Sequence, residues 1–188
     1  MQIKATIAML KTAGVLFAPG ISDTELRQIE TLYRLRFPPD LKEFLKSALP
    51  ISKGFPNWRD GAEREIMSKL EWPYDGMCFD IKNNAFWLDR WGEQPASTDA
   101  ACAIARQAVG TAPVLIPIYS HRYIPDRPCE RGNPVLSVYQ TDIIFYGRDL
   151  SDYFENEFSR TSQERELALQ FKHNQVKRIE FWSDIIER

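Results

Sequence analysis

His121 is the residue in this sequence whose neighbours most resemble a reactive site. Asp126, Cys129 and Glu130 follow it within one short segment, and all four are residue types that bind metal ions. Their spacing matches no zinc-binding pattern, which makes a metal site the weaker of two interpretations. The stronger interpretation is a structural histidine whose ring hydrogen-bonds the loop backbone. We therefore predict that no metal binds here.

Nucleophilic catalysis would need a serine, cysteine or threonine beside a histidine base. The only other histidine, His173, lies in a polar stretch and is expected to be a solvated helix residue. The chain has no glycine-rich nucleotide loop and no HExxH motif. No pair of carboxylates stands alone in apolar surroundings, where a raised pKa would make a general acid. We expect no catalytic residue and no cofactor; an enzyme using His121 with a carboxylate is the least favoured alternative.

Partner binding is the other chemistry that single residues suggest. Trp58 lies in the segment ISKGFPNWRDG at 51–61, which is typical of a loop, and Arg59 follows it directly. An exposed tryptophan beside an arginine is a common anchor of protein interfaces. We treat both residues as candidate contacts, against the alternative that Trp58 is buried.

Four acidic residues gather at the beginning of a predicted helix over 149–158. Asp149 and Asp152 are explained by the favourable interaction of negative charge with a helix N-terminus. Glu155 and Glu157 extend the group further than that interaction requires. A second interpretation is an acidic patch for a partner, and both interpretations stay open.

The composition argues against several classes of protein. The 188 residues carry a formal net charge of −2 and no basic stripe, so we expect no nucleic-acid partner. No stretch of about 18 apolar residues exists, so no membrane span is predicted. The three cysteines are odd in number and widely spaced, which favours reduced thiols and a cytoplasmic location.

The elements that position these residues begin with a helical hairpin over 20–50. Ser22 and Glu25 form an S-x-x-E capping box, and Pro38-Pro39 predicts a tight turn between the two helices. Apolar periodicity predicts further helices over 2–12, about 62–70 (capped by Asp60) and 98–109 (ended by Gly110).

Strands dominate the region that follows. They are predicted over 76–82, 114–119, 135–140 and 142–146, with a long loop over 120–134. Because helices, strands and helices come in separate runs, we predict an α+β fold with an antiparallel or mixed sheet. The N-terminal helical hairpin and C-terminal helices would flank this sheet.

The C-terminal residues, about 163–188, are predicted to form a helical extension. Val176, Ile179, Trp182 and Ile185 lie on one apolar face of it. Either the domain itself or a second copy of the chain, as a homodimer, must cover that face.

Several short motifs occur in an order that resembles the SUKH superfamily, which includes the yeast cell-wall-assembly regulators of the Smi/Knr type. The first half has GISD at 20–23 and FPPDL at 37–41. The second half has LIPIYSHRYIP at 115–125, GNPVLSVYQTDIIFYG at 132–147 and DLSDYFENEF at 149–158. The resemblance therefore covers a core of about 20–158, within one domain of residues 1–188.

This resemblance implies a protein-binding fold without catalytic residues. Many bacterial members are predicted immunity proteins, which bind and neutralise a cognate toxin, often a nuclease. A regulatory or scaffold module that binds a host protein is the alternative. The residues that we expect at the partner surface are Trp58, Arg59, His121, Arg122, Tyr123, Asp149, Asp152 and Glu155.

Overall fold

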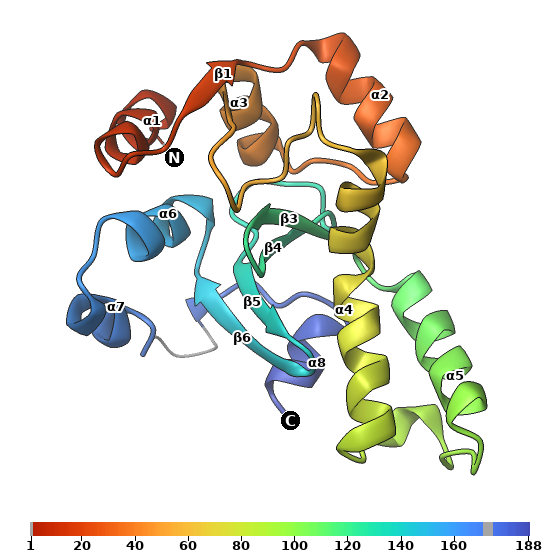
Figure 1. The fold of residues 1–188 in the computed structure, drawn as a ribbon. Helices are drawn as coiled ribbons and strands as arrows, with labels where there is room; N and C mark the ends of the chain where they lie inside the picture. Colours follow the sequence, from red (N-terminus) through yellow and green to blue (C-terminus); the bar gives the residue numbers. More distant parts are fainter. Residues whose placement is uncertain (1, 171–174) are drawn as a thin grey trace.

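A four-stranded antiparallel sheet lies at the centre of the molecule (Figure 1). This computed structural model describes residues 2–170 and 175–188. With the helices around the sheet, the chain has the predicted α+β fold. The strands are neighbours in chain order: β3 (Leu115–Tyr119), β4 (Arg122–Pro125), β5 (Val135–Tyr139) and β6 (Asp142–Gly147).

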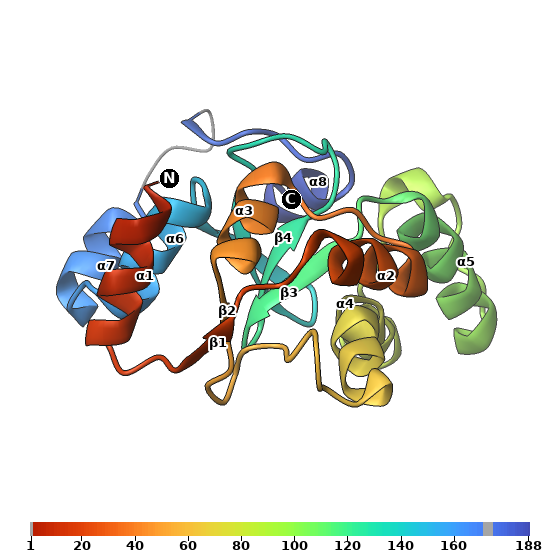
Figure 2. The ribbon, with the colours of Figure 1, turned by 90° about the horizontal axis from the view of Figure 1, so that it is seen from above.

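The predicted helical hairpin over 20–50 is present in the N-terminal part (Figure 2). The capping box forms as expected, because Ser22 Oγ accepts a hydrogen bond from the Glu25 N–H while the Glu25 carboxylate accepts one from the Ser22 N–H at 2.8 Å. Two short strands at either end of the hairpin pair with each other. The elements are α1 (Ile3–Thr12), β1 (Phe17–Pro19), α2 (Asp23–Tyr33), α3 (Pro39–Ser47) and β2 (Ala48–Pro50).

Helix α4 (Glu63–Asn83) continues through the region predicted as a strand over 76–82, and that prediction was wrong. Met77, Cys78 and Ile81 are buried at the three-to-four-residue spacing of a helix face. The expected cap was also wrong, because Ala62 rather than Asp60 precedes the first turn. Pro73 lies inside the helix. Proline in a helix interior usually kinks or ends the helix, but the 21-residue helix α4 continues past it.

Helix α5 (Thr98–Thr111) runs beside α4 and is joined to it by the short 3-10 helix η1 (Asp89–Trp91) (Figure 2). Gly110 was expected to end α5 but lies within its last turn. The helix ends at Thr111 instead, because Ala112 is already extended and Pro113 follows, which cannot donate a backbone hydrogen bond.

The predicted long loop over 120–134 contains strand β4, which is a further correction. Ser120 adopts a positive φ of 51°, so the chain turns sharply at Ser120–His121 and β4 pairs back on β3. Ile124 is fully buried there. The prolines and charged residues that are typical of a loop indicate one only after Pro125.

The central sheet separates two hydrophobic cores. Alternate residues point to opposite faces, so Ile124 and Tyr146 pack with the N-terminal helices while Tyr123 and Phe145 pack with α4 and α5. Helix α4 contributes to both cores, because Ile66 is buried in the core of the N-terminal helices and Met77 is buried in the other core.

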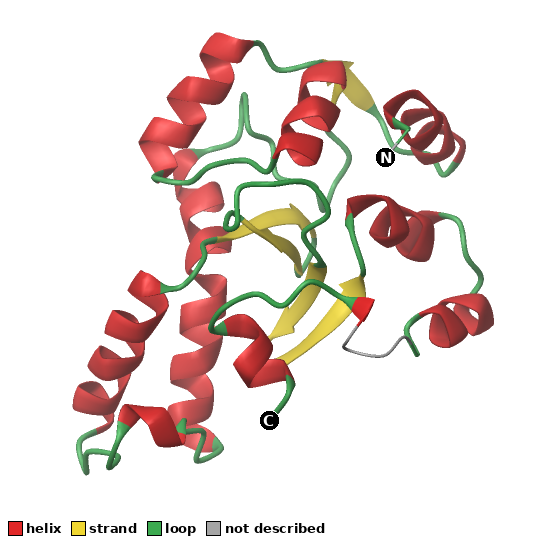
Figure 3. Ribbon diagram, turned by 180° about the vertical axis from the view of Figure 1, so that it is seen from behind, coloured by secondary structure: helices red, strands yellow, loops and turns green. Residues whose placement is uncertain are grey.

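The C-terminal apolar face is covered by this chain itself. Val176, Ile179, Trp182 and Ile185 are all buried in the core that α4 and α5 share with the sheet, and Trp182 Nε1 donates to the Pro113 carbonyl at 2.7 Å. The short helix that begins at Trp182 lies against β6 (Figure 3). The predicted extension is only partly helical. Its elements, with the preceding helix, are α6 (Leu150–Phe158), α7 (Ser162–Ala168) and α8 (Trp182–Ile186).

Within residues 2–170 and 175–188, the helices are all too short or too polar to cross a membrane.

Candidate functional site

Trp58 is buried, so its predicted role as an exposed anchor was wrong. Only 7% of the residue is exposed, and its ring packs edge-on against Phe37 at 5.2 Å and Tyr33 at 6.0 Å between centroids. Arg59 beside it is held by Glu25 at 2.6 Å. The loop folds back onto the helical hairpin, which the sequence spacing did not indicate.

Arg122 and Tyr123 are also buried, contrary to prediction, because they belong to β4. Arg122 Nη1 donates to Ser137 Oγ at 2.8 Å, Nε donates to Glu157 at 3.2 Å, and the guanidinium lies 3.8 Å from the Tyr146 ring centroid. Tyr123 is 1% exposed, and burial raises the pKa of its hydroxyl. These two side chains support the sheet instead of facing a partner.

The acidic group at α6 does not form the continuous patch that was one of two interpretations. Asp149 caps the helix by accepting from the Ser151 and Asp152 N–H groups. Asp152 is buried; burial alone would raise the pKa of its carboxyl, but hydrogen bonds from Arg148 outweigh that effect and lower it. Of the three predicted contact acids, only Glu155 is exposed, and it pairs with Arg160 at 3.4 Å.

His121 lies at the β3–β4 turn and lines a surface groove. Its Nδ1 is 3.2 Å from Ser120 Oγ, so its ring partner is a side chain instead of the predicted loop backbone. Burial, and then the charge of Arg122, lowers the pKa of His121. Asp126, suggested as a co-ligand, is instead buried and accepts from the Val114 N–H at 2.7 Å.

Groups of three or more metal-binding side chains are absent from residues 2–170 and 175–188. His173 lies outside the described residues.

The groove beside His121 has a volume of about 830 Å³. It forms because the β3–β4 hairpin ends at Ser120–His121, whereas β5 and β6 continue to a turn at Gln140–Thr141. The outer face of α4 is thereby left uncovered beside the longer hairpin. The groove is lined by Arg64, Glu65, Ser68, Lys69, Trp72, Ser120, His121, Tyr123 and Tyr139.

Three exposed aromatic side chains extend from this groove into a neighbouring hollow of about 210 Å³. Trp72 and Phe79 come from α4 and are 43% and 48% exposed, and Tyr139 from β5 is 59% exposed. We call Trp72, Phe79 and Tyr139 the aromatic patch. Trp72 Nε1 donates to the Val138 carbonyl at 3.1 Å, which fixes the indole against the hairpin.

The helix and the hairpin that carry the patch are joined tightly. A Cβ atom added at Gly76 would lie 2.7 Å from Gln140 Cα, so only glycine permits this approach of α4 to the turn. Asp80 accepts from the Thr141 N–H at 2.9 Å. Burial opposes its ionisation, but the Thr141 hydrogen bonds lower the pKa of Asp80 overall.

The sequence does not indicate the aromatic patch directly, because the pattern of residues 76–82 predicts a strand. As a continuous helix, the segment places Trp72 and Phe79 two turns apart on one face, and that spacing is the signal that could have found them.

Comparisons of this chain with protein-family models, with curated proteins and with solved structures found no match.

Proposed function

We propose that this chain is a non-catalytic protein-binding module, and specifically an immunity-type protein that binds and neutralises a toxin. The observation that carries the protein-binding part is the aromatic patch. Large aromatic side chains dominate the energetics of protein interfaces, and grouped exposure of such side chains marks interaction surfaces. The resemblance to the SUKH superfamily is what supports the toxin as partner.

The construction of the patch favours tight binding. Trp72 is held by its hydrogen bond to Val138, and the hairpin that carries Tyr139 is clamped by Asp80. Side chains that are already ordered lose little conformational entropy on association. An interface of standard size, about 800 Å² on each partner, would extend beyond the patch to the groove at His121.

The test is co-expression of this chain with the toxin-like domain encoded beside it. We expect cells to survive only with this chain present, and the two proteins to purify together. Trp72→Ala should abolish protection while the variant still folds. Leu167→Ala is the matched control, because Leu167 is an exposed apolar residue on the distant helix α7 and is 69% exposed.

Two results would contradict the proposal. Protection that survives loss of Trp72 and Tyr139 together would exclude the patch as the binding surface. Failure to protect, with one abundant host protein purified in place of the toxin, would favour the alternative of a regulatory or scaffold module.

A further inference from the structure

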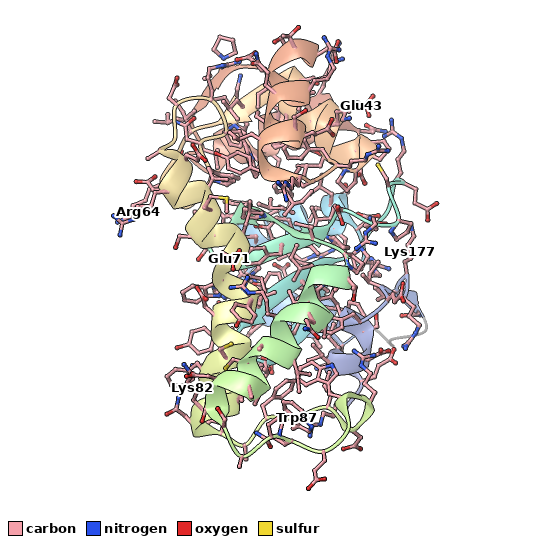
Figure 4. The ribbon with its side chains drawn as sticks, turned by 90° about the vertical axis from the view of Figure 1, so that its right-hand side faces the viewer. Glu43, Arg64, Glu71, Lys82, Trp87 and Lys177 are labelled. Atoms are coloured by element: carbon pink, nitrogen blue, oxygen red, sulfur yellow. The ribbon has the colours of Figure 1, made fainter. Side chains whose placement is uncertain are left out.

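The groove carries two positive charges that have no partner in the part of the chain that is described. Arg64 is exposed, and its side chain extends away from α4 into solvent (Figure 4). Lys69 follows on the same helix and lines the same groove. Neither side chain takes part in a hydrogen bond or ion pair among residues 2–170 and 175–188. By contrast, Glu71 on another face of α4 is paired with Arg106 of α5.

The groove is net positive although the whole chain is net negative. Glu65 is the one carboxylate among its lining residues, against the cations Arg64 and Lys69. Burial and the neighbouring Arg122 lower the pKa of His121, so the imidazole is largely neutral near pH 7. The formal charge of the chain is −2, so the positive groove is a local feature.

Polar and apolar groups lie at defined positions along the groove. Arg64 and Lys69 come from the N-terminal half of α4, and Trp72 follows them one turn further along the helix. Tyr139 of β5 lines the same groove and, with Trp72, the neighbouring hollow. A ligand that spans the groove must therefore present negative charge at one end and an apolar side chain at the other.

We propose that the groove binds an acidic segment of the partner protein, with carboxylates at Arg64 and Lys69 and an apolar side chain against Trp72 and Tyr139. This inference rests on the proposed function and specifies the chemistry of the partner. Guanidinium and ammonium groups form strong charge-assisted hydrogen bonds with carboxylates. A neutral or basic segment would leave both cations uncompensated, so the same groove disfavours such partners.

A peptide assay on the full chain tests the charge requirement directly. The probe is a dye-labelled peptide of alternating Glu and Leu with one central Phe, followed by fluorescence anisotropy. We expect it to bind, and its affinity to fall as salt is raised. A peptide with Gln in place of every Glu should bind more weakly by a factor of about ten or more.

Charge reversals on α4 locate the binding site. Arg64→Glu and Lys69→Glu should each weaken the acidic peptide about tenfold. Lys82→Glu is the matched control, because Lys82 is exposed near the other end of the same helix (Figure 4) and should leave affinity within about twofold. Equal binding of the Gln peptide, or no effect of either groove reversal, would overturn the proposal. So would displacement of the peptide by a tighter-binding single-stranded oligonucleotide.

The partner complex separates this inference from the proposed function. If Trp72→Ala abolishes co-purification with the toxin but Arg64→Glu and Lys69→Glu do not, the acidic segment is excluded while the protein-binding function stands. If no protein partner is found, the proposed function fails, and the peptide assay still decides the chemistry of the groove.

Discussion

Trp58 and Trp72 are the same residue type in opposite environments. Trp58 is enclosed by Phe37 and Tyr33, whereas Trp72 lies on the surface and is fixed by one hydrogen bond to Val138. Burial rather than residue type therefore decides which of them can contact a partner. The sequence context, a loop with charged neighbours, indicated the wrong one.

Substitution of the two tryptophans separates stability from binding. Trp58→Ala removes a large buried ring and should lower the free energy of unfolding by about 3–5 kcal/mol. Trp72→Ala should lower it by only ~1 kcal/mol, because much of the indole is already in water and one neutral hydrogen bond is lost. Urea unfolding measures both values. A larger loss for Trp72→Ala than for Trp58→Ala would contradict this assignment.

At the scale of elements, the junction between α4 and the β5–β6 turn determines the shape of the candidate site. Gly76 allows the helix to approach Gln140, and Asp80 binds Thr141 one turn further along. Both contacts join residues far apart in the sequence. They keep Tyr139 beside the helix that carries Trp72 and Phe79.

Two glycine substitutions test this close approach. Gly76→Ala should destabilise the protein by about 1–3 kcal/mol, because the new Cβ would overlap backbone atoms of Gln140. Gly110→Ala is the matched control: it also lies in a helix, and nothing stands within 4 Å of its added Cβ. That variant should be more stable by roughly 0.5–1 kcal/mol through helix propensity. Thermal unfolding of both variants checks the difference, and equal behaviour would exclude the steric explanation.

The Asp80 clamp should show itself in the pH dependence of stability. Its pKa in the folded protein lies below the ordinary value of 3.8, because the Thr141 hydrogen bonds outweigh the cost of burial. A depressed folded pKa contributes stability that is complete above the unfolded value and is lost as pH falls through the folded value. Asp80→Asn should therefore be less stable than the wild type at neutral pH.

The difference between the Asp80→Asn variant and the wild type should shrink as the pH falls below 3.8. Urea unfolding at neutral and acidic pH measures it. Glu164→Gln is a useful control, because the pKa of Glu164 is also lowered but by a local cap at α7, far from the hairpin. A stability difference between Asp80→Asn and the wild type that grows as the pH falls would contradict the lowered pKa of Asp80.

The elements that the sequence predicted well are those with local signals. The capping box at Ser22 and the prolines after Phe37 specify the helical hairpin without help from the rest of the chain. Helix α4 was predicted wrongly because residues 76–82 alternate enough to favour a strand, whereas Gly76 and Pro73 are tolerated within a helix for tertiary reasons. Most residues of the candidate site lie on α4, so the site could not be predicted once the helix was predicted wrongly.

At the scale of the whole molecule, one sheet serves two cores. Leu26 of α2 lies in the core on one face, and Trp182 of α8 lies in the core on the other. Neighbouring residues of one strand, such as Tyr123 and Ile124, belong to different cores. Disruption of either core must therefore disturb the strands on which the other core depends.

This shared sheet predicts a single cooperative unfolding transition. Leu26→Ala and Trp182→Ala should each lower the free energy of unfolding, by about 2–5 and 3–5 kcal/mol respectively, without splitting the transition. Far-ultraviolet circular dichroism reports the helices, and tryptophan fluorescence reports the burial of the rings. We expect the unfolding curves from the two probes to coincide in both variants, because β4 and β5 each contribute residues to both cores. Two separate transitions in the Trp182→Ala variant would contradict this prediction. They would mean that the N-terminal helices and their core unfold independently of α4, α5 and α8. The groove would then lie at the edge of the less stable of the two units.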